Sequence, residues 1–377
     1  MPSAAETVAL PGAMPGTQRQ LRVFSFGDPG ARPKAYLQAG LHADEPSGMM
    51  ILRELCKLLA EAEEKGEIKG EVVVVPMANP LGVDQALNSA VMGRFELRTG
   101  ANFNRAWPNL VGGLADSVRK RLGKDAEANV ELVRRELRRR IAALQPENPT
   151  MAQRIAIARR AYDADLVVDL HCDDEALSYM MAPDELWDEA KRFAADVGVH
   201  SLQPSGDSSG AHCFDDCFLE PWLALHKEFG EQVPLACKAF TFEMGGVLDV
   251  DPKQAARYAQ GFFRHLRRIG CIAGAAPRLR PNGLNEFRTF EMLDSPAGGL
   301  LLYRQQLGEW VSPGDVLAEI VDPTAPDLDA APMVIKASMK GCVVSRRLSR
   351  QVAFGDFVVM LAGHEKPASG KSKSLLD

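Results

Sequence analysis

Short apolar runs rich in β-branched residues alternate with longer stretches of helical periodicity, and this alternation constrains the fold most strongly. The runs EVVVVPMAN at 71–79 and LVVDLH at 166–171 are apolar on both faces, as in buried strands of a parallel sheet. Further strands are predicted at 22–26, 35–41 and 236–245, and helices at 49–64, 125–144, 149–162, 184–198 and 252–270. Strands alternating with helices predict an α/β domain with a mostly parallel or mixed sheet.

The texture of the sequence changes near residue 275. The segment GAAPRLRPNGLNEF is rich in Pro, Gly and Arg and reads as a linker at 276–287. Beyond it, short strand-like pieces separated by Gly and Pro predict a β-rich domain at 288–363. We expect a loose leader at 1–20, a catalytic domain at 21–275 and a disordered tail at 364–377.

Length and charge narrow the class of protein. The chain has 377 residues, 46% of them apolar, which is enough for a large domain and a smaller one. A net charge of −6 without a basic stripe argues against nucleic acid as a partner. No run approaches the roughly 20 apolar residues of a membrane span, and the N-terminus does not read as a signal peptide. Seven irregularly spaced cysteines favour a reducing cytoplasm over a disulfide framework.

Three side chains of the kind that bind zinc follow predicted strands. His42 and Glu45 stand three residues apart in GLHADEPSG, between a strand and a helix, so that both can converge on one point. His171 ends the apolar strand VVDLHCD, and ligand sites of open α/β sheets lie beyond the carboxyl ends of strands. We therefore predict that His42, Glu45 and His171 bind a metal ion.

Two acidic residues on predicted strands belong to the same hypothesis. Asp169 lies two residues before His171 and shares its side of the strand, either as a partner of a ligand imidazole or as a structural hydrogen bonder. Glu243 is an acid in the otherwise apolar run FTFEMGG. Buried charges need a partner, and we favour a catalytic role over an ion pair in the core.

Arginine and asparagine cluster in GRFELRTGANFNRAWP at 93–108. Arginine recognises a planar carboxylate through two parallel hydrogen bonds, so Arg105 with Asn104 predicts an anionic substrate end. Arg94 and Arg98 lie close upstream in the sequence.

The motifs GLHADEPSG, NFNRAWP, VDLHCD and FTFEMGG, in this order, resemble those of the succinylglutamate desuccinylase/aspartoacylase family of the zinc carboxypeptidase-like superfamily. The resemblance covers about residues 20–360. It implies a three-layer α/β/α sandwich with a mixed central sheet, followed by a small all-β domain resembling a barrel-sandwich.

The resemblance also implies roles for single residues. His42, Glu45 and His171 match the family's ligands for one Zn²⁺ per chain, and Glu243 matches its general base. A His₂Glu set also binds other divalent metals, so the identity of the metal stays open.

The predicted substrate-binding segment departs from the family in one respect. Asn104 and Arg105 match the pair that holds the substrate carboxylate, but the chain reads Asn-Phe-Asn-Arg at 102–105 where better-known members read Asp-Leu-Asn-Arg. Arg98 and Arg94 compete for polarising the scissile carbonyl, and spacing favours Arg98.

These residues predict a metal-dependent amidohydrolase acting on bonds other than peptide bonds. Three protein ligands leave one zinc position for a water that attacks the amide of a small N-acyl amino acid, with Glu243 as base. The alternatives are a carboxypeptidase acting on peptides and a non-catalytic binding protein on the same fold. We expect a small anionic substrate, no nucleic acid or membrane partner and a cytoplasmic location, and leave homo-oligomerisation open.

Overall fold

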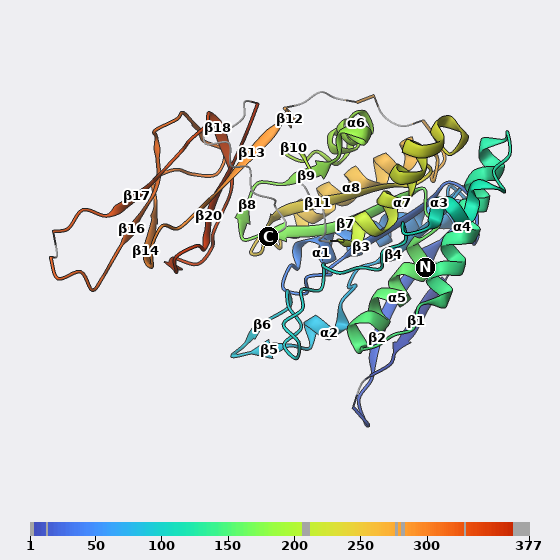
Figure 1. Ribbon diagram of the computed structural model, residues 1–377, viewed down its shortest axis with the longest axis horizontal. Coiled ribbons are helices and arrows are strands. Elements are labelled where there is room, and N and C mark those ends of the chain that lie inside the picture. The colour runs from blue at the N-terminus through green and yellow to red at the C-terminus, as the bar shows by residue number, and fades with distance from the viewer. Residues whose placement is uncertain are drawn as a thin grey trace. The chain divides into compact units, whose positions relative to one another are not determined.

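The computed structural model describes residues 4–12, 14–205, 212–275, 278–279, 283–327 and 329–364. Contacts divide the chain into two compact units. Figure 1 shows the ribbon, coloured by residue number from the N-terminus to the C-terminus. The first comprises Met1–His171, Ser209–Phe242 and Val250–Arg280, and the second Cys172–Ser208, Glu243–Asp249 and Pro281–Asp377. The predicted catalytic domain at 21–275 includes two of the segments of the second unit, and its boundaries stay a prediction.

A mixed sheet forms the centre of the first unit. Its strands, in spatial order, are β1 (Ala4–Leu10), β2 (Arg19–Phe26), β4 (Glu71–Val75), β3 (Lys34–Ala39), β7 (Leu166–Asp173) and β11 (Lys238–Gly246). β2 is antiparallel to both β1 and β4, whereas β3 is parallel to both β4 and β7. β3 is buried along its whole length, which agrees with the predicted apolar strands.

Helices cover both faces of this sheet (Figure 1). On one face α1 (Ser47–Glu64) packs against α8 (Pro252–Arg268) and contacts the strands β2, β3 and β4. The other group consists of α3 (Leu114–Arg119), α4 (Ala126–Ala143), α5 (Pro149–Ala161) and α7 (Phe214–Phe229). The predicted three-layer sandwich is therefore confirmed. A short helix α2 (Pro80–Val83) and the hairpin β5 (Ala86–Leu87) and β6 (Ala90–Val91) follow β4.

Local capping signals explain where several helices begin. The side chain of Asn148 accepts a hydrogen bond from Met151 N at the start of α5, and Asp251 caps α8 in the same way. Both helices carry proline in the first turn, where no backbone donor is needed. The sequence pattern does not predict α7, because Pro221 lies inside that helix and proline disfavours helix interiors.

The predicted loose leader is wrong for the residues that the structure describes there. Ala4–Leu10 forms the edge strand β1, paired with β2 from Ala4↔Ser25 to Leu10↔Arg19. Most of its side chains are exposed, so the strand lacks the apolar run that marks a buried one.

The second unit begins with three parallel strands. β9 (Tyr179–Ala182) and β12 (Asn285–Glu286) both pair with β10 (Ser201–Pro204), and the helix α6 (Trp187–Val197) packs on β9 and β10. β12 lies within the predicted linker at 276–287, of which residues 276–277 and 280–282 lie outside the described residues. Single turns of 3₁₀ helix occur at Asp184–Leu186 here and at Gly230–Gln232 in the first unit.

Two antiparallel sheets make up the C-terminal region of the second unit. One has the order β13 (Thr289–Asp294), β20 (Phe357–Gly363), β18 (Gly341–Arg346), β15 (Trp310–Val311), with β8 (Glu175–Ala176) also paired to β18. The other has the order β17 (Met333–Lys336), β16 (Val316–Val321), β14 (Gly299–Tyr303), β19 (Gln351–Val352). Both sheets contribute to one apolar core, for example through Leu301 and Val343, as the predicted all-β domain requires.

The C-terminal tail and membrane spans were also predicted from the sequence. The predicted tail at 364–377 lies, except for His364, outside the described residues. Within the part of the chain that the structure describes, every helix is too short or too polar to cross a bilayer.

Candidate metal centre

His42, Glu45 and His171 meet at one end of the sheet in the first unit. His42 and Glu45 lie on the loop between β3 and α1, and His171 lies near the end of β7. Because β3 and β7 are parallel neighbours, their carboxyl ends share one edge of the sheet. All three residues are at most 5% exposed, and one ligand atom of each lies within 4.8 Å of the others.

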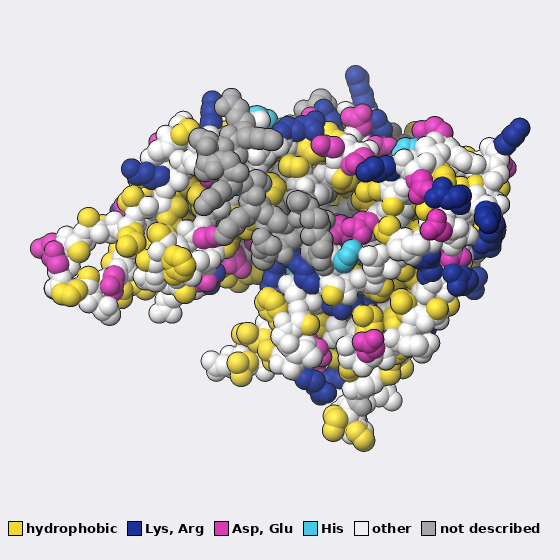
Figure 2. All heavy atoms as spheres, viewed as in Figure 1, with side chains coloured by type: hydrophobic (Ala, Val, Ile, Leu, Met, Phe, Trp, Pro, Cys, Tyr) yellow, Lys and Arg dark blue, Asp and Glu magenta, His cyan; other side chains and the backbone are white. Residues whose placement is uncertain are grey.

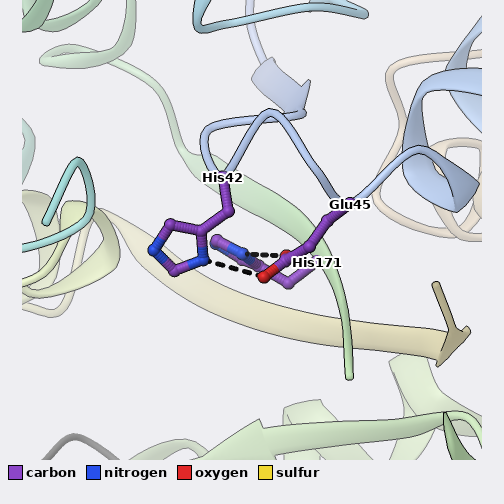
Figure 3. Close-up of side chains that lie close together, drawn as sticks. All are labelled: His42, Glu45 and His171. Atoms are coloured by element: carbon purple, nitrogen blue, oxygen red, sulfur yellow. Dashed lines mark hydrogen bonds and ion pairs between the residues drawn. The ribbon is translucent and has the colours of Figure 1, made fainter. Parts of the chain in front are cut away.

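The Glu45 carboxylate lies between the two imidazoles (Figure 3). Its Oε1 atom is 2.9 Å from Nδ1 of His42, and its Oε2 atom is 2.7 Å from Nδ1 of His171. Both histidines therefore turn the same ring nitrogen, Nδ1, toward the centre of the cluster.

A neutral amide holds the outer nitrogen of His42. Nε2 of His42 is 2.9 Å from Oδ1 of Asn102, and that same Oδ1 accepts the backbone N–H of Asn104 at 2.8 Å. A backbone N–H only donates, so the Asn102 atom must be the oxygen and Nε2 of His42 must carry a proton. In a neutral imidazole this leaves the lone pair on Nδ1, directed at the cluster.

A carboxylate holds the outer nitrogen of His171. Its Nε2 is 2.9 Å from Oδ2 of Asp169, whose Oδ1 accepts a hydrogen bond from Gln38 at 3.2 Å. Gln38 in turn accepts a hydrogen bond from the Tyr36 hydroxyl at 3.0 Å, and all of these side chains are buried. Of the two roles left open for Asp169, the geometry favours the partner of the ligand imidazole.

The cluster carries unequal charges. Burial lowers the pKa of His42, so this imidazole is neutral near neutral pH. Burial also opposes charge on His171, but Asp169 and Glu45 outweigh it and raise the pKa of His171 well above its ordinary value. Although burial alone would raise the pKa of Glu45, the neighbouring histidines hold it well below the usual range. Without a metal, the cluster therefore keeps a proton on His171.

This donor set fits a divalent cation. Two imidazole nitrogens and one carboxylate converge from a buried site, and the opposite nitrogen of each ring has an acceptor of its own. That is the ligand set and the outer support of catalytic His₂Glu zinc sites. The three predicted ligands are thus brought together as one candidate metal centre.

Arg94, and not Arg98, lies beside this cluster. Nη1 of Arg94 is 3.2 Å from Oε1 of Glu45 and 3.3 Å from Nδ1 of His42. Arg98 is exposed, and its side chain makes no hydrogen bond or ion pair with any described residue. The geometry thus brings Arg94 to the cluster, and the role of Arg98, for which spacing in the sequence was the argument, stays a prediction.

Of the two predicted carboxylate-binding residues, Asn104 contacts the cluster, and Arg105 follows it in the chain. Oδ1 of Asn104 accepts the backbone N–H of Phe214 at 2.9 Å, and this turns its Nδ2 toward Nε2 of His171, 3.3 Å away. Nη1 of half-buried Arg105 donates to the Asn104 carbonyl at 2.9 Å and lies 3.5 Å from Sγ of Cys213. Their contact with a substrate stays a prediction.

A buried arginine that the sequence analysis did not single out organises this segment. Arg154, on α5, donates to the carbonyl oxygens of Asn102 at 3.1 Å, Phe103 at 3.4 Å and Ala106 at 3.2 Å. It is 6% exposed. Its burial could have been predicted from helical spacing, because the apolar residues three and four positions later, Ile157 and Ala158, place Arg154 on the apolar face of α5.

A second group of potential ligands consists of Cys213, Asp215 and Asp216 at the start of α7. Asp216 accepts the backbone N–H of Cys213 at 3.1 Å, and Asp215 accepts the hydroxyl of Thr241 at 2.9 Å. Burial raises the pKa of Asp215 to about 7. Helix capping accounts for the placement of Cys213 and Asp216.

The predicted general base Glu243 lies on β11, in the segment that belongs to the second unit, and is half-buried. Its catalytic role stays a prediction.

Comparison with known proteins gives the family. The model of the succinylglutamate desuccinylase/aspartoacylase catalytic domain matches residues 31–269. The chain is 24% identical over 339 residues to the N-alpha-acetyl-L-2,4-diaminobutyric acid deacetylase of Halomonas elongata, covering 88% of this chain and 83% of that protein.

Solved structures share the fold at low identity. One, from Shewanella frigidimarina and grouped with succinylglutamate desuccinylase/aspartoacylase, superposes with a TM-score of 0.84 at 22% identity over 97% of this chain and 98% of its own. The product-bound ectoine utilization protein EutE (DoeB) of Ruegeria pomeroyi superposes with a TM-score of 0.68 at 18% identity over 96% and 95%. With the matched catalytic domain spanning more than half of its length, the chain belongs to the succinylglutamate desuccinylase/aspartoacylase family.

Proposed function

We propose that this protein is a zinc-dependent deacylase that hydrolyses the amide bond of a small N-acyl amino acid or a related carboxylate. The observation that carries the proposal is the Glu45 carboxylate held between Nδ1 of His42 and Nδ1 of His171. Membership of a deacylase family and the likeness to a deacetylase support amide hydrolysis as the reaction.

His42, Glu45 and His171 would hold the metal, one ion per chain. A divalent ion bound by three protein ligands supplies Lewis acidity and lowers the pKa of a water molecule at its open position. Asn102 and Asp169 would prepare the ligands, because each accepts the Nε2–H of one imidazole. The Nδ1 lone pair is then available for the cation, on His171 once its second proton has left.

The remaining residues would act on the substrate. Arg94, beside Glu45, would donate to the amide oxygen as negative charge develops there. Arg105 and Asn104 would bind the substrate carboxylate and thereby orient the amide. Glu243 would take a proton from the attacking water and deliver it to the leaving amine, a role that rests on the family resemblance. A small anionic substrate and a cytoplasmic setting belong to the same proposal.

The test is a turnover screen of the zinc-loaded protein against N-acyl amino acids and short peptides, together with metal analysis. We expect one zinc per chain, hydrolysis of N-acyl amino acids, and loss of zinc in His171→Ala. Glu243→Gln should keep its zinc and lose nearly all turnover, whereas Glu319→Gln, which removes only a surface ion pair with Arg304, should match the wild type. Preferential cleavage of peptides would point to a carboxypeptidase, and absence of zinc and of turnover would contradict an enzymatic role.

A further inference from the structure

We propose that Phe95 forms an apolar wall for the acyl group of the substrate, so that the enzyme favours N-acyl amino acids with an apolar acyl chain. This inference rests on the proposed deacylase function and specifies its substrate class. It follows from the position of the segment 85–103, which carries both polar contacts to the metal cluster and a group of exposed apolar side chains.

The segment is seated directly on the loop that holds two of the metal ligands. The Gly93 carbonyl accepts the backbone N–H of Ala43 at 3.1 Å, between His42 and Glu45 in the sequence. A Cβ atom at residue 93 would lie 2.2 Å from the backbone nitrogen of Asp44, so only glycine permits this approach. Arg94, the next residue, reaches Glu45 and His42. The position of Phe95 is therefore fixed relative to the cluster.

Phe95 faces Asn102 across a two-stranded bridge. Glu96 N donates to Ala101 O at 2.8 Å, and Phe103 N donates to Arg94 O at 3.1 Å. This pattern makes Phe95 and Asn102 a pair without hydrogen bonds between them, the arrangement in which cross-strand side chains come closest and share one face. Since the Asn102 amide binds His42, Phe95 shares its face of the bridge with a side chain that contacts one of the proposed metal ligands.

The apolar side chains around Phe95 are exposed although they are large. Phe95 is 47% exposed and Leu97 is 58% exposed, and the same segment also exposes Leu87, Val91 and Met92. Figure 2 shows apolar side chains on the projection where Figure 1 labels the strands β5 and β6. Gln85 stabilises this group by donating to the carbonyls of Met92 and Phe95 and accepting from Leu97 N. Single exposed apolar residues are ordinary, but a group beside a candidate active site indicates a ligand surface.

The order of polar and apolar groups matches one end of an N-acyl amino acid. The proposed function assigns Arg94 to the amide oxygen, and Arg105 and Asn104 to the carboxylate of the amino acid. Phe95 follows Arg94 directly in the chain, and we therefore assign it to the acyl group next to that amide. An apolar acyl chain lying on Phe95 would remove both surfaces from water, and each buried methylene would strengthen binding by up to about fourfold.

The experiment measures both binding and turnover of N-acetyl, N-butyryl and N-hexanoyl derivatives of one amino acid by the full-length zinc-loaded protein. In the wild type we expect the dissociation constant to fall by about two- to fourfold per methylene. Phe95→Ala should abolish most of this dependence, and Phe95→Leu should restore part of it. Phe354→Ala removes an 80% exposed phenylalanine of the second unit and should keep the wild-type dependence.

The outcomes separate this inference from the proposed function. Binding that does not improve with acyl length, or a dependence that Phe95→Ala leaves intact, would overturn the inference even if hydrolysis is efficient. Binding that improves with acyl length without any hydrolysis would keep the apolar wall and reject the deacylase function.

Discussion

Asn102 presents its side-chain oxygen to Nε2 of His42 at 2.9 Å, while the same oxygen accepts the backbone N–H of Asn104. The other ligand imidazole, His171, has a carboxylate at the equivalent nitrogen. The two imidazoles of the cluster are thus supported unequally, one by a neutral amide and one by an anion. Because such outer partners fix the orientation and basicity of metal ligands, this difference has measurable consequences.

The first prediction concerns Asn102. Asn102→Ala removes the acceptor of the His42 N–H, and we expect zinc affinity to fall by about 10- to 100-fold. Asn102→Asp keeps the acceptor, adds charge to it and should bind zinc at least as tightly as the wild type. Competition with a chelator measures both. Asn109→Ala, which removes only an acceptor within its own turn, is the control. An unchanged affinity in Asn102→Ala would show that the hydrogen bond does not support the metal site.

The second prediction is a coupling between zinc and protons. The raised pKa of His171 leaves its imidazole protonated in the metal-free protein at neutral pH, but a ligand nitrogen must be deprotonated. Zinc binding should therefore release about one proton and strengthen about tenfold per pH unit until pH reaches the raised pKa. Calorimetry in buffers of different ionisation enthalpy counts the proton. A binding heat that is independent of the buffer would contradict this.

The same shift predicts how the metal-free protein responds to alkali. A pKa raised in the folded state contributes stability that is fully present below the unfolded value of about 6.5 and is lost as pH rises through the folded value. Chelator-treated protein should therefore lose thermal stability from neutral to alkaline pH more steeply than His171→Asn does. His226→Gln alters an imidazole that bonds the Val233 carbonyl instead, and should retain the wild-type slope.

The fourth prediction decides between two arginines. Arg94→Ala should lower kcat/KM by about 10²- to 10³-fold, because it removes the donor placed beside the cluster, while zinc content stays unchanged. Arg98→Ala should be close to the wild type, since Arg98 is exposed and its side chain contacts no described polar partner. A large loss of kcat/KM in Arg98→Ala, with Arg94→Ala close to the wild type, would assign the carbonyl-polarising role to Arg98.

The fifth prediction concerns the buried guanidinium of Arg154. Arg154→Met leaves the carbonyls of Asn102, Phe103 and Ala106 without this donor, and we expect the free energy of unfolding to fall by about 2–4 kcal/mol. Zinc affinity should also fall, because Asn102 loses its support. Arg159→Met changes an exposed arginine of the same helix and is the control in urea denaturation. Equal stability of the two variants would assign Arg154 no organising role.

The sequence was informative where a signal is local or periodic. Apolar runs rich in β-branched residues predicted buried strands, and β4 and β7 lie where these runs occur. It was misleading for the edge strand β1, which exposes most of its side chains. It was also misleading for α7, where the packing of Phe214 and Trp222 outweighs an internal proline. In both cases tertiary contacts overrode the local pattern.

The sequence by itself indicated the candidate metal ligands, because His42, Glu45 and His171 follow apolar strands whose carboxyl ends share one edge of a parallel sheet. Only the tertiary structure decided what surrounds them. Gly93 seats a hairpin on the ligand loop, so Arg94 reaches Glu45 and Arg98 does not, although the latter is closer to Asn104 in the chain. Spacing along a chain limits which residues can meet, but the direction of each side chain depends on contacts between segments that are remote in sequence.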